Sequence, residues 1–301
     1  LQRGFNSLRE ELGAKADARY LVISRTLMFR ILLSEPSSYP LIFSHSYKGT
    51  LRRFLGSRCG LLDEELVALN LSDAAFPQGL DTQVSLESDE SSLSSLLQSN
   101  NEKIQTFTKG TKDTYLEYLH DIGLMDQEHI QLVDIGYSGT IQKALGILTS
   151  RRVSGHYMVT TQSAESNASH TFIGYLFNRQ QWGQGCSVLE HSLYLEALLT
   201  SPTGSAKNIR KGATGFEFTY GPTTESQDYF HLLEIIFQGA IDYCANSIAH
   251  SFSLTPADVN ELYSLVISNK ECFPELSKKI MVVEDNYSGL GNIKPTDLYA
   301  N

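Results

Sequence analysis

Short apolar runs alternate along this chain with segments whose apolar residues recur at helical spacing. Runs at residues 20–24, 131–133, 153–161 and 170–177 predict short strands, and apolar helices are expected soon after the first two. Parallel strands are joined by crossovers that are usually helices, so this alternation favours an α/β fold. The pattern predicts an α/β fold with a mostly parallel sheet, centred on residues 131–200.

Helical periodicity accounts for most of the remaining chain. Helices are expected at residues 6–16, 49–56, 61–70, 102–122, 189–201, 226–250 and 256–285, with a short strand or turn at 41–43 and a hairpin at 212–222. The Ser- and acid-rich segment 81–101 is expected to be a solvated helix or a mobile insert. We therefore expect an α/β core over residues 1–222, which carries this insert, and a helical cap or extension over 223–301.

The strongest chemical signal is the segment 131–145. Its apolar run ends in Asp134, a loop follows, and an apolar-periodic helix begins directly after the loop. The loop holds Gly136, Tyr137, Ser138, Gly139 and Thr140. The first N–H groups of a helix lack partners and its dipole favours negative charge, so the loop predicts a phosphate site. Asp134 would be repelled by a phosphate and is expected to face sugar hydroxyls or a metal ion.

An alternative interpretation of this loop is structural. Ser138 or Thr140 can act as the N-cap of the following helix, and the segment is then an ordinary turn between a strand and a helix. The sequence is neither a P-loop nor a dinucleotide-binding fingerprint, so neither type of site is predicted.

Composition restricts the classes of partner. The net charge is −10, which lacks the basic footprint of a nucleic-acid-binding protein, so any anion site must be local. The four cysteines have no metal-binding or paired spacing, which fits a reducing compartment. No apolar run reaches the roughly 20 residues of a membrane span, and no signal peptide is recognised. Because the chain begins at Leu1, we expect it to be part of a longer polypeptide.

Ligands of open α/β sheets bind at the carboxyl ends of strands, so Arg25 and the loop at 134–140 are expected at one edge of the sheet. Arg25 directly follows the first predicted strand and can bind phosphate with two parallel hydrogen bonds, although a lone arginine more often pairs with an acid. Lys48 and Arg52 belong to the densest basic patch. They are expected either to bind a phosphorylated ligand or to form the solvated side of a helix.

A second polar cluster spans residues 190–205. Glu190 and Glu196 are six residues apart, so only one of them is expected to face a site. The small polar turn that follows consists of Thr203, Gly204 and Ser205, which either contact a ligand or simply end a helix. Trp182 is expected to be a packed loop anchor or, alternatively, an aromatic residue that stacks on a sugar ring.

The segments VDIGYSGTIQKAL (133–145) and LEALLTSPTGS (195–205) resemble a known family. It is the PRPP-dependent, phosphoribosyltransferase-like ribofuranosyltransferase family of bacterial polysaccharide biosynthesis, whose members are often fused to a HAD-type phosphatase. YLVISR (20–25) is a weaker match of the same kind. The resemblance implies a phosphoribosyltransferase-like core. It also implies transfer of 5-phosphoribosyl from PRPP to a sugar hydroxyl of a growing glycan, such as a capsule or O-antigen, with release of pyrophosphate.

The resemblance also implies roles for individual residues. Asp134 would contact the ribose hydroxyls directly or through Mg²⁺, the loop 136–140 would hold the 5-phosphate, and Arg25 would hold the pyrophosphate. Glu196 or Glu190 would accept the proton of the acceptor hydroxyl. Ile135 stands where the family has a second acid.

Partners and location follow from the same resemblance. The acceptor would be a lipid-linked or polymeric glycan, and a HAD-type phosphatase, in the same polypeptide or separate, would then remove the 5-phosphate. The implied location is the cytoplasm or the inner face of the membrane. The alternatives are a non-catalytic module that binds a phosphosugar or docks a phosphatase, and a nucleotide-sugar glycosyltransferase, although the D-x-D signature is missing.

Overall fold

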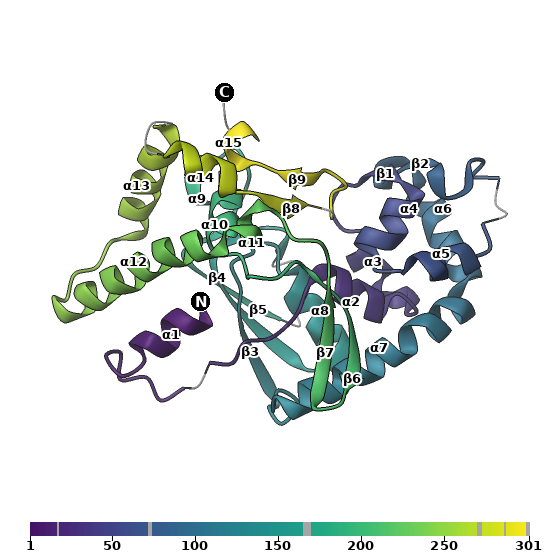
Figure 1. The fold of residues 1–301 in the computed structure, drawn as a ribbon, viewed down its shortest axis with the longest axis horizontal. Helices are drawn as coiled ribbons and strands as arrows, with labels where there is room; N and C mark the ends of the chain where they lie inside the picture. Colours follow the sequence, from purple (N-terminus) through teal and green to yellow (C-terminus); the bar gives the residue numbers. More distant parts are fainter. Residues whose placement is uncertain (17, 72–73, 165–169, 270–272, 286, 299–301) are drawn as a thin grey trace.

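The computed structural model describes residues 1–16, 18–71, 74–164, 170–269, 273–285 and 287–298, which form an α/β fold (Figure 1). Its strands are β1 (Lys48–Thr50), β2 (Gln83–Ser85), β3 (His129–Val133), β4 (Arg152–Thr161), β5 (Thr171–Gln180), β6 (Ala206–Gly212), β7 (Gly215–Tyr220), β8 (Val283–Asp285) and β9 (Gly291–Ile293). Strands β3, β4 and β5 form a parallel sheet in that order. The other described strands form the antiparallel pairs β1–β2, β6–β7 and β8–β9. The parallel sheet is therefore smaller than the sequence pattern suggested.

Helices fill much of the remaining described chain. They are α1 (Gln2–Leu8), α2 (Arg25–Leu32), α3 (Tyr39–Ile42), α4 (Leu51–Arg53), α5 (Asp63–Ala68), α6 (Leu86–Ser99), α7 (Asn101–Asp121), α8 (Thr140–Thr149), α9 (Ser187–Glu190), α10 (Ser192–Leu198), α11 (Glu225–Asp228), α12 (Phe230–Ala249), α13 (Pro256–Ser268), α14 (Glu275–Ile280) and α15 (Pro295–Leu298). A π-helix covers Phe54–Arg58, and short 3₁₀ turns cover Pro36–Ser38 and Gly79–Asp81. None of the helices in the described ranges is both long and apolar enough to cross a membrane.

The strand expected at residues 20–24 is wrong, because the backbone there bonds to tyrosine side chains instead of a neighbouring strand. The Val22 N–H donates to the Tyr118 hydroxyl at 3.0 Å, and the Tyr115 hydroxyl donates to the Val22 carbonyl at 3.0 Å. Both tyrosines belong to α7. The segment is extended and leads into α2 as expected, but it is anchored by a helix.

Two other local expectations also differ from the structure. Residues 41–43 end the helix α3, where Pro40 lies in the first turn and favours helical backbone, so no strand forms. The first helix ends at Leu8 and does not extend to residue 16. Gly13 adopts a left-handed backbone conformation with φ +60°, which a continuous helix does not permit.

Helix α2 lies between two hydrophobic cores. Phe29 and Leu33 pack into a core with α3, α6 and the π-helix, whereas Leu27 and Ile31 pack into a second core with α7, α8, β3 and β6. Every residue from Leu27 to Leu33 is buried, including Arg30. Because α2 packs against both cores, its N-terminus is held in place between them.

The segment 81–101 contributes to the first of these cores. Most of it forms α6, whose Leu86, Leu93, Leu96 and Leu97 are buried. These leucines recur at helical spacing and turn one face inward, while the serines and acids lie mostly on the other side. The helical alternative thus applies, and its apolar face is packed.

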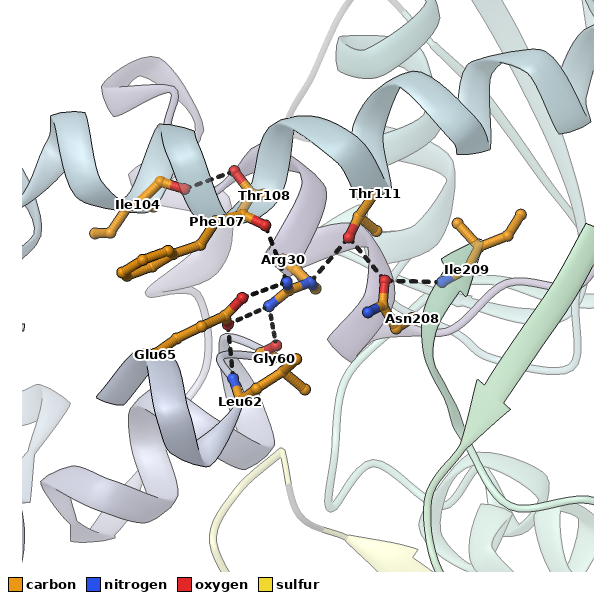
Figure 2. A network of polar contacts seen from close by, with 10 residues as sticks. All are labelled: Arg30, Gly60, Leu62, Glu65, Ile104, Phe107, Thr108, Thr111, Asn208 and Ile209. Carbon is orange, nitrogen blue, oxygen red and sulfur yellow. Dashed lines mark hydrogen bonds and ion pairs between the residues drawn. The ribbon is translucent and has the colours of Figure 1, made fainter. Parts of the chain in front are cut away.

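A polar network around Arg30 connects the elements beside α2 (Figure 2). Arg30 is 2% exposed and forms two parallel hydrogen bonds of 2.7 Å with Glu65. Its other N–H groups bond to the Gly60 carbonyl (2.8 Å), the Phe107 carbonyl (3.1 Å) and the Thr111 hydroxyl (3.1 Å). The network thereby ties α2 to α5 and α7, and Thr111 extends it to Asn208 of β6 at 2.7 Å.

The C-terminal hairpin β8–β9 returns to the N-terminal half of the molecule (Figure 1). Tyr287 is buried in the same core as Phe29. Its hydroxyl donates to the Ser44 carbonyl at 2.7 Å. Residues after 223 are therefore not only helical, and part of this region contacts the start of α2.

Candidate functional site: an anion loop between β3 and α8

The loop between β3 and α8 is anchored at both sides, so its backbone shape is fixed. The Asp134 N–H continues the sheet by donating to the His156 carbonyl at 3.0 Å, and the Tyr137 carbonyl accepts from the Thr161 N–H at 3.1 Å. Gly139 has φ +64°, and a Cβ there would lie 2.3 Å from the ring of Phe172. Only glycine combines this left-handed backbone with such a close approach to β5.

The Asp134 carboxylate faces back onto its own loop. Its Oδ1 accepts the Gly136 N–H at 3.0 Å. Burial raises the pKa of Asp134, opposed by the hydrogen bond from Gly136 and by the charge of Arg25. The Gly136 amide is therefore already used by Asp134, and any anion must be bound by later amides of the loop.

Six consecutive amides follow that are free to bind an anion. In the parts of the chain that the structure describes, the N–H groups of residues 137–142 donate to no protein acceptor. Three of them are the unpaired groups that any helix start has, but the other three belong to the loop itself. The hydroxyls of Ser138 and Thr140 lie 3.1 Å apart and add further donors. This run of donors, hereafter the anion loop, comprises residues 137–142.

Arg25 faces the anion loop from the first residue of α2. Ser24 fixes this helix start, because its hydroxyl accepts the Leu27 N–H at 3.0 Å and donates to the Ala206 carbonyl. The Arg25 guanidinium lies 4.3 Å from the ring centroid of Tyr287, and it has no hydrogen bond or ion pair with the described residues. A cation at a helix N-terminus is disfavoured by the dipole, so a bound anion would stabilise it.

Glu196, on α10, completes the acidic side of the site. It accepts no hydrogen bond from the described residues. Burial raises its pKa, Arg25 lowers it, and Asp285 and Asp134 raise it further. The Tyr137 pKa is likewise raised, mainly by burial and then by Glu196. A partly buried carboxylate without hydrogen-bond partners, beside an arginine without partners, is typical of a functional site.

A basic group lies on the other side of Arg25. The His45 pKa is lowered by burial and then by the charges of Arg25, Arg58 and Lys143. His45 has a left-handed backbone with φ 68°, and its Nδ1 lies 3.1 Å from the Tyr287 hydroxyl. Arg58 lies 4.0 Å from the Tyr287 ring centroid and bonds only to backbone carbonyls, so no carboxylate of the described chain neutralises it. Arg58 therefore adds a positive charge near Arg25, whereas the lowered pKa of His45 favours its neutral form.

Several candidate residues lie outside this arrangement. Glu190 accepts the Gly185 N–H at 2.9 Å and shows no electrostatic interaction with Asp134 or Glu196. Lys48 is exposed, and Arg52 lies 3.7 Å from Asp81 on the surface. The structure therefore brings Arg25, Asp134 and Glu196 together with the loop. It places Glu190, Lys48 and Arg52 elsewhere.

The turn 203–205 lies at the border of the site. The Ser201 hydroxyl donates to the Thr203 carbonyl at 2.7 Å, and a Cβ on Gly204 would lie 2.5 Å from the Gly221 carbonyl. The Ser205 hydroxyl donates to Glu284 at 3.0 Å, next to Asp285. The turn supports the hairpin β8–β9, and its side chains already bond within the protein.

Two comparisons with known proteins were without a match. No family model matches the chain, and no curated protein matches it.

Sequence reasoning missed His45, Lys143, Asp285 and Tyr287. Tyr287 and Asp285 come from a short hairpin more than 240 residues after Arg25, so no local pattern could connect them. Lys143 lies in the first turn of the helix that follows the anion loop, and that position was a usable signal.

Two carboxylates near Arg25 have the chemistry of metal ligands. Among the described residues no group of three His, Cys, Asp or Glu side chains is placed to hold a metal ion. Asp134 and Glu196 are nevertheless oxygen ligands of the type that Mg²⁺ prefers, and Mg²⁺ is commonly bound by one or two carboxylates together with substrate phosphates. The donor set thus fits an ion that arrives with a phosphorylated substrate.

Proposed function

We propose that this chain is a glycosyltransferase that moves 5-phosphoribosyl from PRPP to a sugar hydroxyl of a bacterial glycan. The observation that carries the proposal is the pairing of six free loop amides with an arginine that has no hydrogen-bond partner. Such a pair would bind a ligand that has two anionic groups separated by a polyol. PRPP is such a ligand, because it has a phosphate at one end and a pyrophosphate at the other. The parallel strands β3–β5 support a phosphoribosyltransferase-like core.

Each part of the donor has a matching group. The 5-phosphate would accept hydrogen bonds from the anion loop, as phosphates do at helix N-termini. The pyrophosphate would bind Arg25, with Arg58 and Lys143 as further cations nearby. Asp134 would bind the ribose hydroxyls between them through its remaining lone pairs.

Transfer requires one bond to break and one to form at C1 of the ribose. The bond to pyrophosphate breaks, the acceptor oxygen bonds to C1, and the acceptor proton passes to a base. Glu196 fits this base because its carboxylate has no hydrogen-bond partner among the described residues and its pKa is raised. Arg25 would stabilise the negative charge on the departing pyrophosphate. Because PRPP is the α-anomer, direct displacement gives a β-ribofuranoside.

Mg²⁺ is the proposed cofactor, and when bound it would neutralise charge on the pyrophosphate. Asp134 is the residue that would hold it, together with the phosphates of PRPP. A lipid-linked or polymeric glycan is the proposed acceptor, with a HAD-type phosphatase acting on the product. We propose a cytoplasmic location, in solution or peripheral at the inner face of the membrane.

The test is pyrophosphate release from PRPP with Mg²⁺ and a panel of glycan acceptors. We expect Asp134→Ala to lower kcat/KM by roughly 10²–10³, the scale for loss of one preorganised polar group. Asp113→Asn is the control, because Asp113 is an exposed acid on α7. Unchanged turnover by Asp134→Ala would overturn the role of this residue. PRPP binding without turnover on any acceptor would favour a phosphosugar-binding module, and turnover with a nucleotide-sugar would favour that donor class.

A further inference from the structure

An exposed and uncharged loop lies beside Tyr137 of the anion loop. It covers residues 181–185, directly after β5. Trp182 is 53% exposed, and its ring meets the Tyr137 ring edge to face with centroids 5.5 Å apart. Indole rings combine a large apolar surface with one polar N–H and are enriched where proteins bind partners. An exposed tryptophan next to the site therefore suggests a second binding position.

This loop is held in place, so Trp182 is preorganised. Gly183 and Gly185 have positive φ angles of 76° and 83°, which shape the turn. The Gly185 N–H donates to Glu190 at 2.9 Å, and its carbonyl accepts from Asn260 at 3.2 Å. The end of the loop is thus tied to α9 and α13, and its start directly follows β5, so less ordering of the indole is needed when a ligand binds.

A chain of glutamine amides runs beside the indole. The Gln184 amide donates to Gln181 at 2.7 Å, and the Gln181 amide donates to Gln162. All three side chains are exposed. Among the described residues the Gln162 amide nitrogen and the Gln184 amide oxygen have no partner, so the chain offers N–H donors at one end and an acceptor at the other.

We propose that Trp182, Gln162, Gln181 and Gln184 form an acceptor subsite for a neutral sugar unit of the glycan. The subsite deepens the proposed function and rests on it. An aromatic ring covers the apolar C–H face of a sugar, and amides exchange hydrogen bonds with its hydroxyls. Residues 180–189 contain no charged side chain, which favours a neutral sugar over an anionic one.

Tyr137 links this subsite to the proposed reacting groups. Its ring contacts Trp182, and the charge of Glu196 helps to raise the pKa of its hydroxyl. A sugar stacked on Trp182 is thus separated from the proposed base by one side chain. The neighbouring anion loop would hold the donor, so the two substrates would approach each other at Tyr137.

The first test uses Trp182 as its own reporter, because the chain contains one tryptophan. Neutral oligosaccharides of galactose, glucose, mannose and N-acetylglucosamine are titrated into the protein without PRPP, and tryptophan emission is recorded. We expect at least one of them to give a saturable blue shift or intensity change, because stacking removes water from the indole. No saturable change with any of them would overturn the proposal.

The second test separates acceptor from donor binding. Trp182→Ala is expected to raise KM for the responding glycan about tenfold, as for an aromatic hot-spot residue, while KM for PRPP changes less than twofold. Trp182→Phe is expected to have a KM for the glycan between those of the natural chain and Trp182→Ala. Tyr175→Ala is the matched control, because Tyr175 is 68% exposed and stacks on His156 away from this loop. An unchanged acceptor KM in Trp182→Ala would overturn the subsite.

The two proposals fail in different ways. A glycan-dependent change in emission without any turnover of PRPP would support the subsite and contradict the transferase. Transfer from PRPP to a glycan that leaves tryptophan emission unchanged would support the transferase and contradict the subsite.

Discussion

Two arginines five residues apart on α2 have opposite environments. Arg30 is buried, and its guanidinium bonds to Glu65, two backbone carbonyls and Thr111 (Figure 2). Arg25 stacks on Tyr287 and bonds to none of the described residues. The same side chain therefore serves two purposes, and the number of partners that the protein supplies distinguishes them. A fully paired arginine holds elements together, whereas an unpaired one is available for a ligand.

The comparison also applies to the two acids. Glu65 accepts hydrogen bonds from Arg30 and from the Leu62 N–H at 2.8 Å. Glu196 accepts none from the described residues, although it lies within electrostatic reach of Arg25. The first pair is complete without a ligand. Arg25 and Glu196 have hydrogen-bonding groups without partners among the described residues, which lowers the stability of the free protein. A bound ligand can supply the missing partners.

The largest expected effect is on the Arg30 network. Glu65→Ala would leave the Arg30 charge buried and without its carboxylate, so the free energy of unfolding should fall by about 3–5 kcal/mol. Urea denaturation followed by circular dichroism measures this change. The double variant Arg30→Met with Glu65→Leu should recover most of the loss, because apolar residues of similar size replace buried ion pairs well. If the free energy of unfolding of Glu65→Ala falls by less than about 1 kcal/mol, the structural role assigned to the Arg30–Glu65 pair is wrong.

The second prediction concerns Arg25. Arg25→Gln should lower kcat/KM for PRPP by roughly a hundredfold to a thousandfold, because charge on the departing pyrophosphate loses its donor. Its thermal midpoint should stay equal to that of the natural chain or rise. Arg25→Lys should recover part of the activity, since lysine keeps the charge but cannot form two parallel hydrogen bonds. If Arg25→Gln unfolds as easily as Glu65→Ala, Arg25 is structural.

Much of this arrangement was predictable where the signal is local. The order of β3, the loop and α8 follows from residues 131–145, and α2 is the apolar helix expected after residues 20–24. The tyrosine hydroxyls that hold residue 22 come from α7, almost a hundred residues later, so the pattern at 20–24 reads as a strand. Such contacts depend on packing and leave no periodic signal.

The same limit applies to the candidate site. Asp134 could be named because it follows a strand, and Glu196 because it lies in a segment that resembles a known family. Arg25 was named from a strand that does not form, although the segment before it is extended. The choice between Glu190 and Glu196 required the fold, because spacing alone showed only that they occupy different helix faces. Tyr287 and Asp285 reach the site through tertiary packing of the hairpin β8–β9. Sequence reasoning therefore found the groups on the central elements and missed those that the C-terminal hairpin adds.

The smallest expected effect sharpens the comparison at Glu196. Burial raises its pKa, so the folded protein binds this proton more tightly than the unfolded chain does. Its contribution to stability is therefore present at low pH and declines as pH rises from the ordinary glutamate pKa, about 4.3, through the raised folded value. Glu196→Gln removes this decline and should stabilise the protein at neutral pH by roughly 0.5–2 kcal/mol.

The activity of Glu196→Gln should change in the opposite direction. Loss of the base should lower kcat about a hundredfold and remove the acidic limb of the pH–rate profile, which in the natural chain lies above the ordinary glutamate range. Glu190→Gln should keep that limb, because Glu190 bonds to Gly185 and not to the site. Unfolding at several pH values and pyrophosphate release test both variants. A Glu196→Gln protein that is less stable at neutral pH but fully active would show that this carboxylate, like Glu65, belongs to the framework and not to the site.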